Sequence, residues 1–519
     1  MAAILFILYL AATVGLLLHT FFFSWLLRGR RHAALPAPSP LPPLPEVGVP
    51  LQLVQLPVCN EDPGMVGALI DSACALRYPK SRLVIQVLDD SDQEGISRGI
   101  REHVAGRKAA DPERRLEYLH RNERTDYKAG NLNHGLEAAR RHLREEICGD
   151  PDHVIVSIFD ADFVIPEDYL EKVACHFTAL DVCAVQASIR YINGEENVLT
   201  RTQSAFLTNL HLMDFSTRGH AGHLTTFRGS AGSWRLSAIE ALGGWSGDTQ
   251  IEDVDLSMAA QLSGLRIVYL DDLWVSSRLP AGYNGYKLQQ RSWMKGIMEV
   301  WRKHGRGILT SPNLHFRQRI MAADLFLVLS LQPLYMISHH LLAIPSYHFL
   351  QGVGLSDEMG YAAAALAVLL NVSHIPFVRS HLAGADAEVI QAAPAAGRIR
   401  DHVASILVSL GMFATFTSGL LEGILGFRVH REPTQKSGGG SAPRGILPAR
   451  HLTALARITA MELVLAAYSL FFVLWALPRG QWGLLLLYGP FALGYPWVMV
   501  HSLAELRGNT KKTGSRGPA

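Results

Sequence analysis

Long apolar stretches lie at both ends of the chain and leave a polar region between them. They cover residues 1–27, 325–356, 361–378, 458–478 and 480–504. Stretches of about 20 apolar residues can cross a bilayer as helices, so the pattern predicts five membrane-spanning helices. The first stretch carries no charged residue and no small-residue cleavage site. We therefore interpret it as a membrane anchor and not as a signal peptide.

Positive charge predicts the orientation of these helices. The basic segment 28–31 follows the first stretch, and basic residues favour the cytoplasmic side, so residues 50–310 are expected in the cytosol. A sixth stretch, 403–421, is long enough to span but is rich in Ser, Thr and Gly. If it spanned, the basic segment 427–455 would lie outside. We therefore predict that 403–421 lies in the membrane interface, with the N-terminus outside and the C-terminus inside.

Short apolar runs alternate with helical patterns inside the polar region. The runs, at 51–58, 83–89, 153–160 and 184–189, are typical of buried strands. Helical patterns lie between them, at 64–77, 94–106 and 128–146. This alternation predicts a doubly wound parallel sheet. The expected fold class is thus α/β plus membrane α: a doubly wound domain inserted between an N-terminal transmembrane helix and a C-terminal transmembrane helix bundle.

The boundaries follow from composition. Residues 35–50 are proline-rich and 436–445 are rich in Gly and Ser, which is typical of linkers. The expected segments are a transmembrane helix (1–34), a proline-rich linker (35–50), a cytosolic domain (51–310), interface helices with a transmembrane hairpin (311–426), a cytosolic loop (427–455), two transmembrane helices (456–506) and a disordered basic tail (507–519).

Charge and composition limit the classes of binding partner that we expect. Lys and Arg number 48 against 46 Asp and Glu, and charged residues make up only 18% of the chain. A near-neutral balance gives no global field for nucleic acid, so no nucleic-acid partner is expected. Low charge content fits an integral membrane protein with a polar domain, whose partner is the lipid bilayer. Accessory subunits cannot be inferred from these numbers.

Acidic residues follow three of the predicted strands. The strand ends carry Glu61 with Asp62, then Asp89, Asp90 and Asp92, then Asp160 and Asp162. Any one group could simply cap the next helix. Carboxyl ends of parallel strands meet at one edge of a doubly wound sheet, where ligands bind. Three acidic groups on that edge would repel one another unless a divalent cation or a polar ligand relieved the repulsion.

Asp160 and Asp162 are the candidate metal ligands. They are two residues apart, so in extended backbone they face the same side. Such a pair can hold Mg²⁺ or Mn²⁺ and leave positions open for diphosphate oxygens. Lys128, within "YKAGNLNHG" (127–135), could meet a phosphate there or be an ordinary surface charge. The chain has no G-x-x-x-x-G-K-[ST] loop, which disfavours an ATPase.

An ordered set of motifs resembles the membrane-embedded family-2 glycosyltransferases. Within them it is most similar to the cellulose synthase superfamily, in particular to its glucomannan and mannan synthase-like branch. The motifs are "LPVCNE" (56–61), "VLDDSD" (87–92), "YKAGNLNHGL" (127–136), "FDADF" (159–163), "FRGSAGSWR" (227–235), "IEDVDLS" (251–257) and "QQRSWMKG" (289–296). The resemblance runs over nearly the whole chain and implies a GT-A-like cytosolic domain.

This resemblance implies an inverting transfer of a hexose from a nucleotide sugar. Asp253, the last acid of the family's T-E-D element, would be the catalytic base, and a cation on Asp160 and Asp162 would neutralise the leaving diphosphate. The donor-binding residues would be Glu61, Asp89 or Asp90, Lys128, Asp160, Gln289 and Arg291. The acceptor side would hold Trp293, Gly229 and Glu252.

The acidic element 251–257 has two interpretations. Glu252, Asp253 and Asp255 open a predicted helix, where carboxylates are favoured by the helix dipole. A sugar hydroxyl, however, needs a base to take its proton as the new bond forms, and a carboxylate suits that step. We assign this role to Asp253 and expect Glu252 and Asp255 to cap or orient. Ile251 stands where the family has Thr.

The Q-x-x-R-W motif of the family is altered here. Gln289 and Trp293 are in place, but Ser292 replaces the Arg and Arg291 comes one position early. One position is a rotation of about 100° on a helix. Either Arg291 reaches round to the donor, or donor binding is weakened. Trp293 would stack on the acceptor sugar, the alternative being an interfacial anchor.

Three functions remain open at this point. The first is a processive synthase that extends a β-linked polysaccharide from UDP-glucose or GDP-mannose and translocates it, with Thr434, Gln435 and Lys436 in a gating-type loop. The second is a non-processive transferase acting on a lipid acceptor. The third is an inactive membrane scaffold, which the retained acids disfavour. The expected location is a plasma membrane (a bacterial inner membrane) or a Golgi-like membrane.

Overall fold

The computed structural model describes residues 49–142, 151–326, 399–427 and 449–514, together with residues 4, 11, 14 and 15. Several predicted segments lie outside this range. They are nearly all of the anchor 1–27 and of the hairpin 325–378, most of the linker 35–50, and the loop residues Thr434, Gln435 and Lys436.

A seven-stranded mixed sheet forms the centre of the polar domain, in the order β3-β2-β1-β4-β6-β5-β7. Its strands are β1 (Leu51–Val58), β2 (Leu83–Asp89), β3 (Arg115–His120), β4 (Val154–Ile158), β5 (Val182–Tyr191), β6 (Gly232–Arg235) and β7 (Arg266–Ser277). β6 runs antiparallel between β4 and β5, and the other pairs are parallel. The predicted runs 51–58 and 83–89 match β1 and β2 residue for residue.

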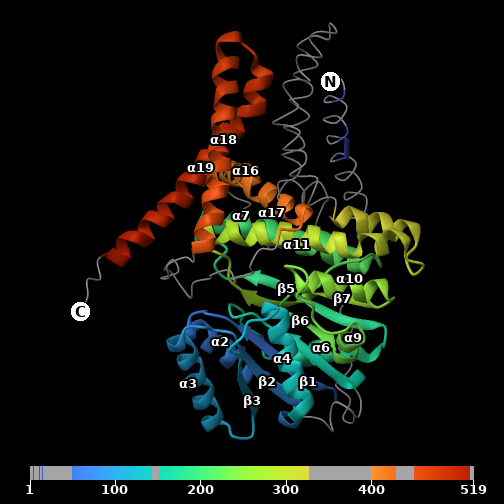
Figure 1. The fold of residues 1–519 in the computed structure, drawn as a ribbon. Helices are drawn as coiled ribbons and strands as arrows, with labels where there is room; N and C mark the ends of the chain where they lie inside the picture. Colours follow the sequence, from blue (N-terminus) through green and yellow to red (C-terminus); the bar gives the residue numbers. More distant parts are fainter. Residues whose placement is uncertain are drawn as a thin grey trace.

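Helices cover both faces of the sheet, as the doubly wound prediction requires (Figure 1). They are α2 (Pro63–Cys74), α3 (Glu94–Ala110), α4 (Tyr127–His142), α6 (Tyr169–Ala174), α9 (Leu236–Ala241) and α10 (Glu252–Leu262). One buried cluster joins the sheet to α2, α3 and α6 through Val66, Ile100 and Tyr169. A second joins the other face to α4, α9 and α10 through Leu132, Ile239 and Leu256. Burial of apolar area on both faces is the main stabilising term for such a domain.

A layer of helices separates the sheet domain from two long apolar helices (Figure 1). The layer contains α7 (Val198–Asn209), α11 (Tyr283–Thr310), α16 (Ile399–Gly411) and α17 (Phe413–Leu425). A π-helix, η4 (Leu210–Ser216), and the short α8 (Thr217–His220) follow α7. Beyond the layer lie α18 (Ala449–Ala476) and α19 (Trp482–Gly514).

Three described helical stretches are long and apolar enough to cross a membrane: Val403–Leu425, Ala449–Arg479 and Leu484–Arg507. Ala449–Arg479 contains the predicted span 458–478, and Leu484–Arg507 overlaps the predicted span 480–504. On α18, Leu463, Val464, Phe471 and Leu474 are exposed, as expected of side chains that contact lipid. In the first stretch, 61% of an apolar 18-residue window is buried inside the protein, and the placement of 403–421 in the membrane interface stays a prediction.

Candidate active site

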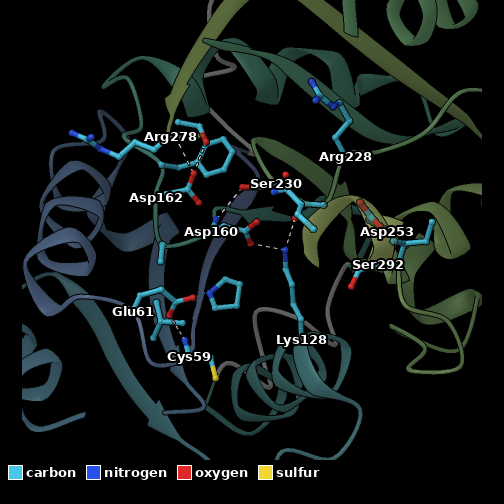
Figure 2. A pocket seen from close by; sticks show the side chains of 18 of the residues that line it. Cys59, Glu61, Lys128, Asp160, Asp162, Arg228, Ser230, Asp253, Arg278 and Ser292 are labelled. Carbon is cyan, nitrogen blue, oxygen red and sulfur yellow. Dashed lines mark hydrogen bonds and ion pairs between the residues drawn. The ribbon is translucent and has the colours of Figure 1, made fainter. Parts of the chain in front are cut away.

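A cavity of about 280 Å³ opens at the carboxyl ends of β1, β2 and β4, and residues of α11 also line it (Figure 2). Ligands of open α/β sheets bind at this edge. The lining includes most of the predicted site residues: Glu61, Asp90, Lys128, Asp160, Asp162, Gly229, Glu252, Asp253, Gln289 and Trp293. Segments separated by more than two hundred residues therefore meet around one cavity. Asp89 and Arg291 are not among the lining residues.

Lys128 links the donor-side acids to the loop that precedes β6. Its Nζ lies 2.5 Å from Oδ1 of Asp160 and donates to the carbonyl oxygen of Gly229 at 2.8 Å. Glu252 lies 3.9 Å away. Burial works to lower the pKa of Lys128, but the charges of Asp160, Glu252 and Asp253 outweigh it and hold that pKa above its ordinary value. Lys128 is thus a fixed cation inside the cavity and not a surface charge.

Asp160 and Asp162 present hard oxygen donors at the end of β4. Asp162 Oδ2 accepts from Ser277 Oγ at 2.5 Å and from the Arg278 amide at 3.1 Å, which fixes its carboxylate. The Asp160 amide donates to Ser230 Oγ at 2.9 Å, and the Asp160 side chain is 35% exposed. Among the described residues no group of three or more His, Cys, Asp or Glu side chains is close enough to hold a metal.

This pair fits a divalent cation of the Mg²⁺ or Mn²⁺ type. Such ions are commonly held by one or two carboxylates together with substrate phosphates, and not by a complete protein cage. The Lys128 ammonium already rests on Asp160, which shows that this carboxylate faces a position where positive charge is stabilised. Asp160 and Asp162 are therefore the residues that would hold the ion.

Glu61 lies across the cavity from Lys128 (Figure 2). Its Oε2 accepts from the Cys59 amide. Burial, added to by the charges of Asp160 and Asp162, raises the pKa of Glu61 from its ordinary 4.5 to about 8. Burial also raises the pKa of the Cys59 thiol. The strand end at 58–61 thus holds a neutral carboxyl and a neutral thiol at pH 7 when the cavity holds no ligand.

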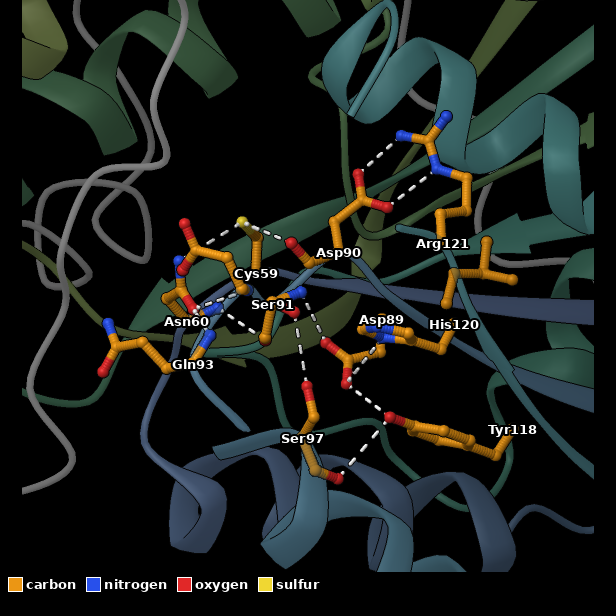
Figure 3. Close-up of polar contacts among 12 residues, drawn as sticks. Cys59, Asn60, Asp89, Asp90, Ser91, Gln93, Ser97, Tyr118, His120 and Arg121 are labelled. Carbon is orange, nitrogen blue, oxygen red and sulfur yellow. Dashed lines mark hydrogen bonds and ion pairs between the residues drawn. The ribbon is translucent and has the colours of Figure 1, made fainter. Parts of the chain in front are cut away.

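The two neighbouring acids at the end of β2, Asp89 and Asp90, have different surroundings (Figure 3). Asp90 lines the cavity, and its two oxygens pair with Arg121 Nε at 2.8 Å and Nη2 at 2.6 Å. Asp89 is fully buried and accepts from Tyr118 OH at 2.6 Å and from the Ser91 amide at 2.8 Å. Of the pair left open by the sequence, the structure places Asp90 at the cavity and Asp89 in the packing beneath it.

α10 brings Glu252 and Asp253 to the cavity. Ser257 Oγ accepts from the Phe227 amide at 2.9 Å and donates to the Asp253 carbonyl at 2.6 Å, which ties α10 to the Gly229 loop. Ile251, at the N-cap, makes no side-chain cap hydrogen bond, as its replacement of Thr implies.

Asp255 turns to α11, away from the cavity. Its oxygens pair with Lys303 at 2.7 Å and His304 at 2.5 Å.

α11 divides the altered Q-x-x-R-W motif between two sides. Gln289, Ser292 and Trp293 line the cavity, and Trp293 is 37% exposed. Gln289 Oε1 is buried with no hydrogen-bond donor among the described residues. Arg291 instead pairs with Glu422 of α17, Nη2 to Oε1, at 2.7 Å. Arg291 therefore does not reach round to the cavity in this structure.

Three arginines that the sequence analysis did not single out also line the cavity: Arg124, Arg228 and Arg278. Arg228 lies within the quoted motif 227–235, directly before Gly229, so its place at the cavity could have been inferred. Its guanidinium contacts His211 Nδ1 at 3.0 Å and Tyr191 OH at 3.3 Å. Arg124 and Arg278 follow strands in loops without a motif, and the sequence carried no signal for them.

The fold and the cavity define a GT-A domain, and comparison with known proteins agrees. The model for "Glycosyl transferase family 2" matches residues 54–242, and that for "Glycosyl transferase family group 2" matches 155–371. The structure is similar to that of the mannosyltransferase PcManGT from Pyrobaculum calidifontis, solved with GDP-Man and Mn²⁺. The TM-score is 0.51 at 17% identity, over 82% of this chain and 100% of that one. At this identity the likeness shows the fold alone.

In sequence, the chain is 34% identical over 275 residues to glucomannan 4-beta-mannosyltransferase 1 of Oryza sativa subsp. japonica. The match covers 53% of this chain and 50% of the rice protein, so the chain spans about half the length of the curated relative it matches. The chain is therefore similar to family-2 glycosyltransferases across residues 54–371, the span that the two family models cover together.

Proposed function

We propose that the protein is an inverting mannosyltransferase that extends a β-linked polysaccharide from GDP-mannose at a cytosolic site beside the membrane. The observation that carries the proposal is the single cavity in which Asp160, Lys128 and Asp253 meet. Mannose is favoured over glucose because the rice relative is named a mannosyltransferase and the Pyrobaculum structure holds GDP-Man.

Donor binding would use the end of the cavity beside β1, β2 and β4. Glu61 and Asp90 face the nucleotide and Lys128 faces the diphosphate. Lys128 is held by Asp160 at 2.5 Å and by Gly229 at 2.8 Å, so its charge is placed before the donor arrives. Fixed charges aimed at the leaving group cost no reorganisation during the reaction. A divalent cation on Asp160 and Asp162 would supply further neutralisation of the leaving diphosphate.

Transfer would use the opposite side, between α10 and α11. Asp253 takes the proton of the acceptor hydroxyl as its oxygen attacks the anomeric carbon, and the bond to the diphosphate breaks on the other face. The anomeric centre is inverted, so an α-linked donor gives a β-linkage. Trp293 offers an aromatic face to the acceptor sugar, and Gln289 Oε1 offers an acceptor for one of its hydroxyls.

The membrane part would serve a growing polymer. We propose that α18 and α19 span the bilayer and that the product leaves through the helix bundle they belong to. Their length and apolar composition support this. A single transfer onto a lipid would use the same cavity but would need no path for a polymer.

The test is to incubate purified protein with Mn²⁺ and radiolabelled GDP-mannose or UDP-glucose, and to size the product. We expect label from GDP-mannose in a polymer that resists lipid extraction and is degraded by a β-mannanase. Label from UDP-glucose would overturn the donor assignment, and a single sugar in the organic phase would overturn the polymer. An Asp160→Ala, Asp162→Ala variant is the control for background incorporation.

A further inference from the structure

The helix that carries the acceptor side of the cavity is attached to three other helices by buried polar contacts. Glu505 of α19 accepts from the Tyr283 amide at 2.6 Å and the Asn284 amide at 3.0 Å, and so caps the start of α11. One turn on, Lys287 pairs with Glu462 of α18 at 2.7 Å, with both side chains fully buried. A further turn on, Arg291 pairs with Glu422 of α17.

α17 packs closely against α11 beside the Arg291–Glu422 pair. α17 carries Gly419 and Gly423 on either side of Glu422. A Cβ at Gly419 would lie 2.4 Å from the Arg291 carbonyl oxygen, and one at Gly423 would lie 2.6 Å from Cβ of Met298. The two backbones therefore approach where only glycine fits, and α17 lies alongside α11 (Figure 1). Small residues spaced by four permit this approach between helices.

The Arg291–Glu422 pair lies next to the α11 residues that face the cavity. Arg291 lies between Gln289 and Ser292 in sequence, and neighbouring positions on a helix are rotated by about 100°. With Arg291 fixed on Glu422, its neighbours Ser292 and Trp293 are turned to the cavity. A rotation of α11 would move Trp293 and the unpartnered Gln289 Oε1 together.

Because the Arg291–Glu422 pair is buried, an orientation of α11 that breaks it is disfavoured. Arg291 and Glu422 are only 11% and 14% exposed. Breaking a buried pair leaves an unpaired charge and is costly, whereas such pairs add little net stability compared with apolar residues. Their best-attested use is to fix one register among several.

We propose that Arg291 and Glu422 are positioning residues: their ion pair sets the rotation of α11 and thereby the seat of the acceptor sugar on Trp293 and Gln289. The arginine that is absent at 292 is thus present at 291 for a different task. The proposal rests on the proposed function only where it names the acceptor.

The test uses Arg291→Met, Glu422→Leu and the charge exchange Arg291→Glu with Glu422→Arg. Arg302→Met is the matched control, because Arg302 also reaches α17, through the Gly423 carbonyl at 3.2 Å, but lies beyond the cavity. Hydroxyl-radical footprinting of Trp293 reports the rotation without any substrate. The KM for a manno-oligosaccharide acceptor reports on the acceptor side of the site, and the Kd for GDP-mannose reports on the donor side.

We expect Arg291→Met to change the Trp293 footprint and raise the acceptor KM about 10-fold, with donor Kd unchanged, since small misplacements cost this much or more. The charge exchange should return both values toward wild type, and Arg302→Met should change neither.

The proposal is overturned if folded Arg291→Met keeps the wild-type footprint, if Arg302→Met has the same effect, or if the exchange does no better than the single variants. If the single variants do not fold, the charge exchange alone decides: a wild-type Trp293 footprint supports the proposal and an altered one overturns it. Failure of the wild type to transfer any sugar would overturn the proposed function and leave the footprint test standing.

Discussion

Gly229 lies directly against the carboxylate of Asp253: a Cβ at Gly229 would come within 2.8 Å of Asp253 Oδ2. The backbone of Gly229 has φ +76°, a conformation that side chains other than glycine rarely adopt. Its carbonyl also accepts from Lys128 at 2.8 Å. One residue without a side chain thus separates the proposed base from the proposed diphosphate cation.

Gly229→Ala should therefore displace Asp253 without removing any charge. We expect kcat to fall by about 10²-fold, because misplacement of a reacting group by ~1 Å has an effect of this size. Binding of GDP-mannose, followed by calorimetry, should change far less. Gly243→Ala is the control, because Gly243 also has positive φ, at +87°, but nothing lies near its Cβ. An equal loss in both variants would show that backbone strain, and not the position of Asp253, is responsible.

Glu61 should make the ligand-free protein less stable as pH rises. Its folded pKa of about 8 lies above the ordinary 4.5, so between these values the unfolded chain has released a proton that the folded protein retains. Stability is therefore lost progressively from about pH 5 to pH 8. Glu61→Gln should flatten this decline in thermal unfolding measured across that window. Glu94→Gln, at an exposed side chain, should not. An unchanged slope in Glu61→Gln would contradict the raised pKa.

Restoring arginine at position 292 should tighten donor binding. Ser292 lines the cavity, and Arg291 is engaged by Glu422, so no arginine of this motif faces the donor. Ser292→Arg adds a cation to the site, and we expect the Kd for GDP to fall about 10-fold at low salt, with the gain shrinking as salt rises. Ser292→Gln controls for side-chain length. If arginine and glutamine act alike, the added charge does not meet the diphosphate.

Removing the acids after β4 should weaken binding of the nucleotide-sugar donor. Asp160→Ala with Asp162→Ala deletes both candidate metal ligands and the carboxylate on which Lys128 rests. We expect Mn²⁺ to lose its effect on GDP-mannose affinity in this double variant, as measured by titration calorimetry with and without the ion. Asp92→Ala, an exposed acid outside the cavity lining, is the control. Retention of a Mn²⁺ effect in the double variant would place the ion elsewhere.

The sequence predicted the buried centre of the sheet because its strands are continuous apolar runs. β1 and β2 are buried along their full length. Near-continuous apolar runs of this kind are typical of parallel strands that are covered on both faces. β3 is half exposed, and β6 has only four residues, two of them Gly232 and Ser233, so neither gave a clear pattern. β6 is also the strand that makes the sheet mixed.

The site residues could be predicted where the evidence for them is local in sequence, and could not where it depends on contacts between distant segments. Acids at strand ends are local, so Glu61, Asp90, Asp160 and Asp162 could be placed from sequence. The fate of Arg291 could not, because its partner Glu422 is 131 residues away in sequence. Only the packing of α17 on α11 shows that this arginine faces α17 and not the donor.

Asp253→Asn tests the central claim most directly, because it removes the proposed base while keeping the shape of the side chain. We expect kcat for mannosyl transfer to fall by about 10²- to 10⁴-fold, the usual contribution of a general base. The Kd for GDP-mannose should stay close to the wild-type value. Asp255→Asn, a buried acid on the same helix that pairs with Lys303 and His304, is the matched control. Normal turnover by Asp253→Asn would contradict the account.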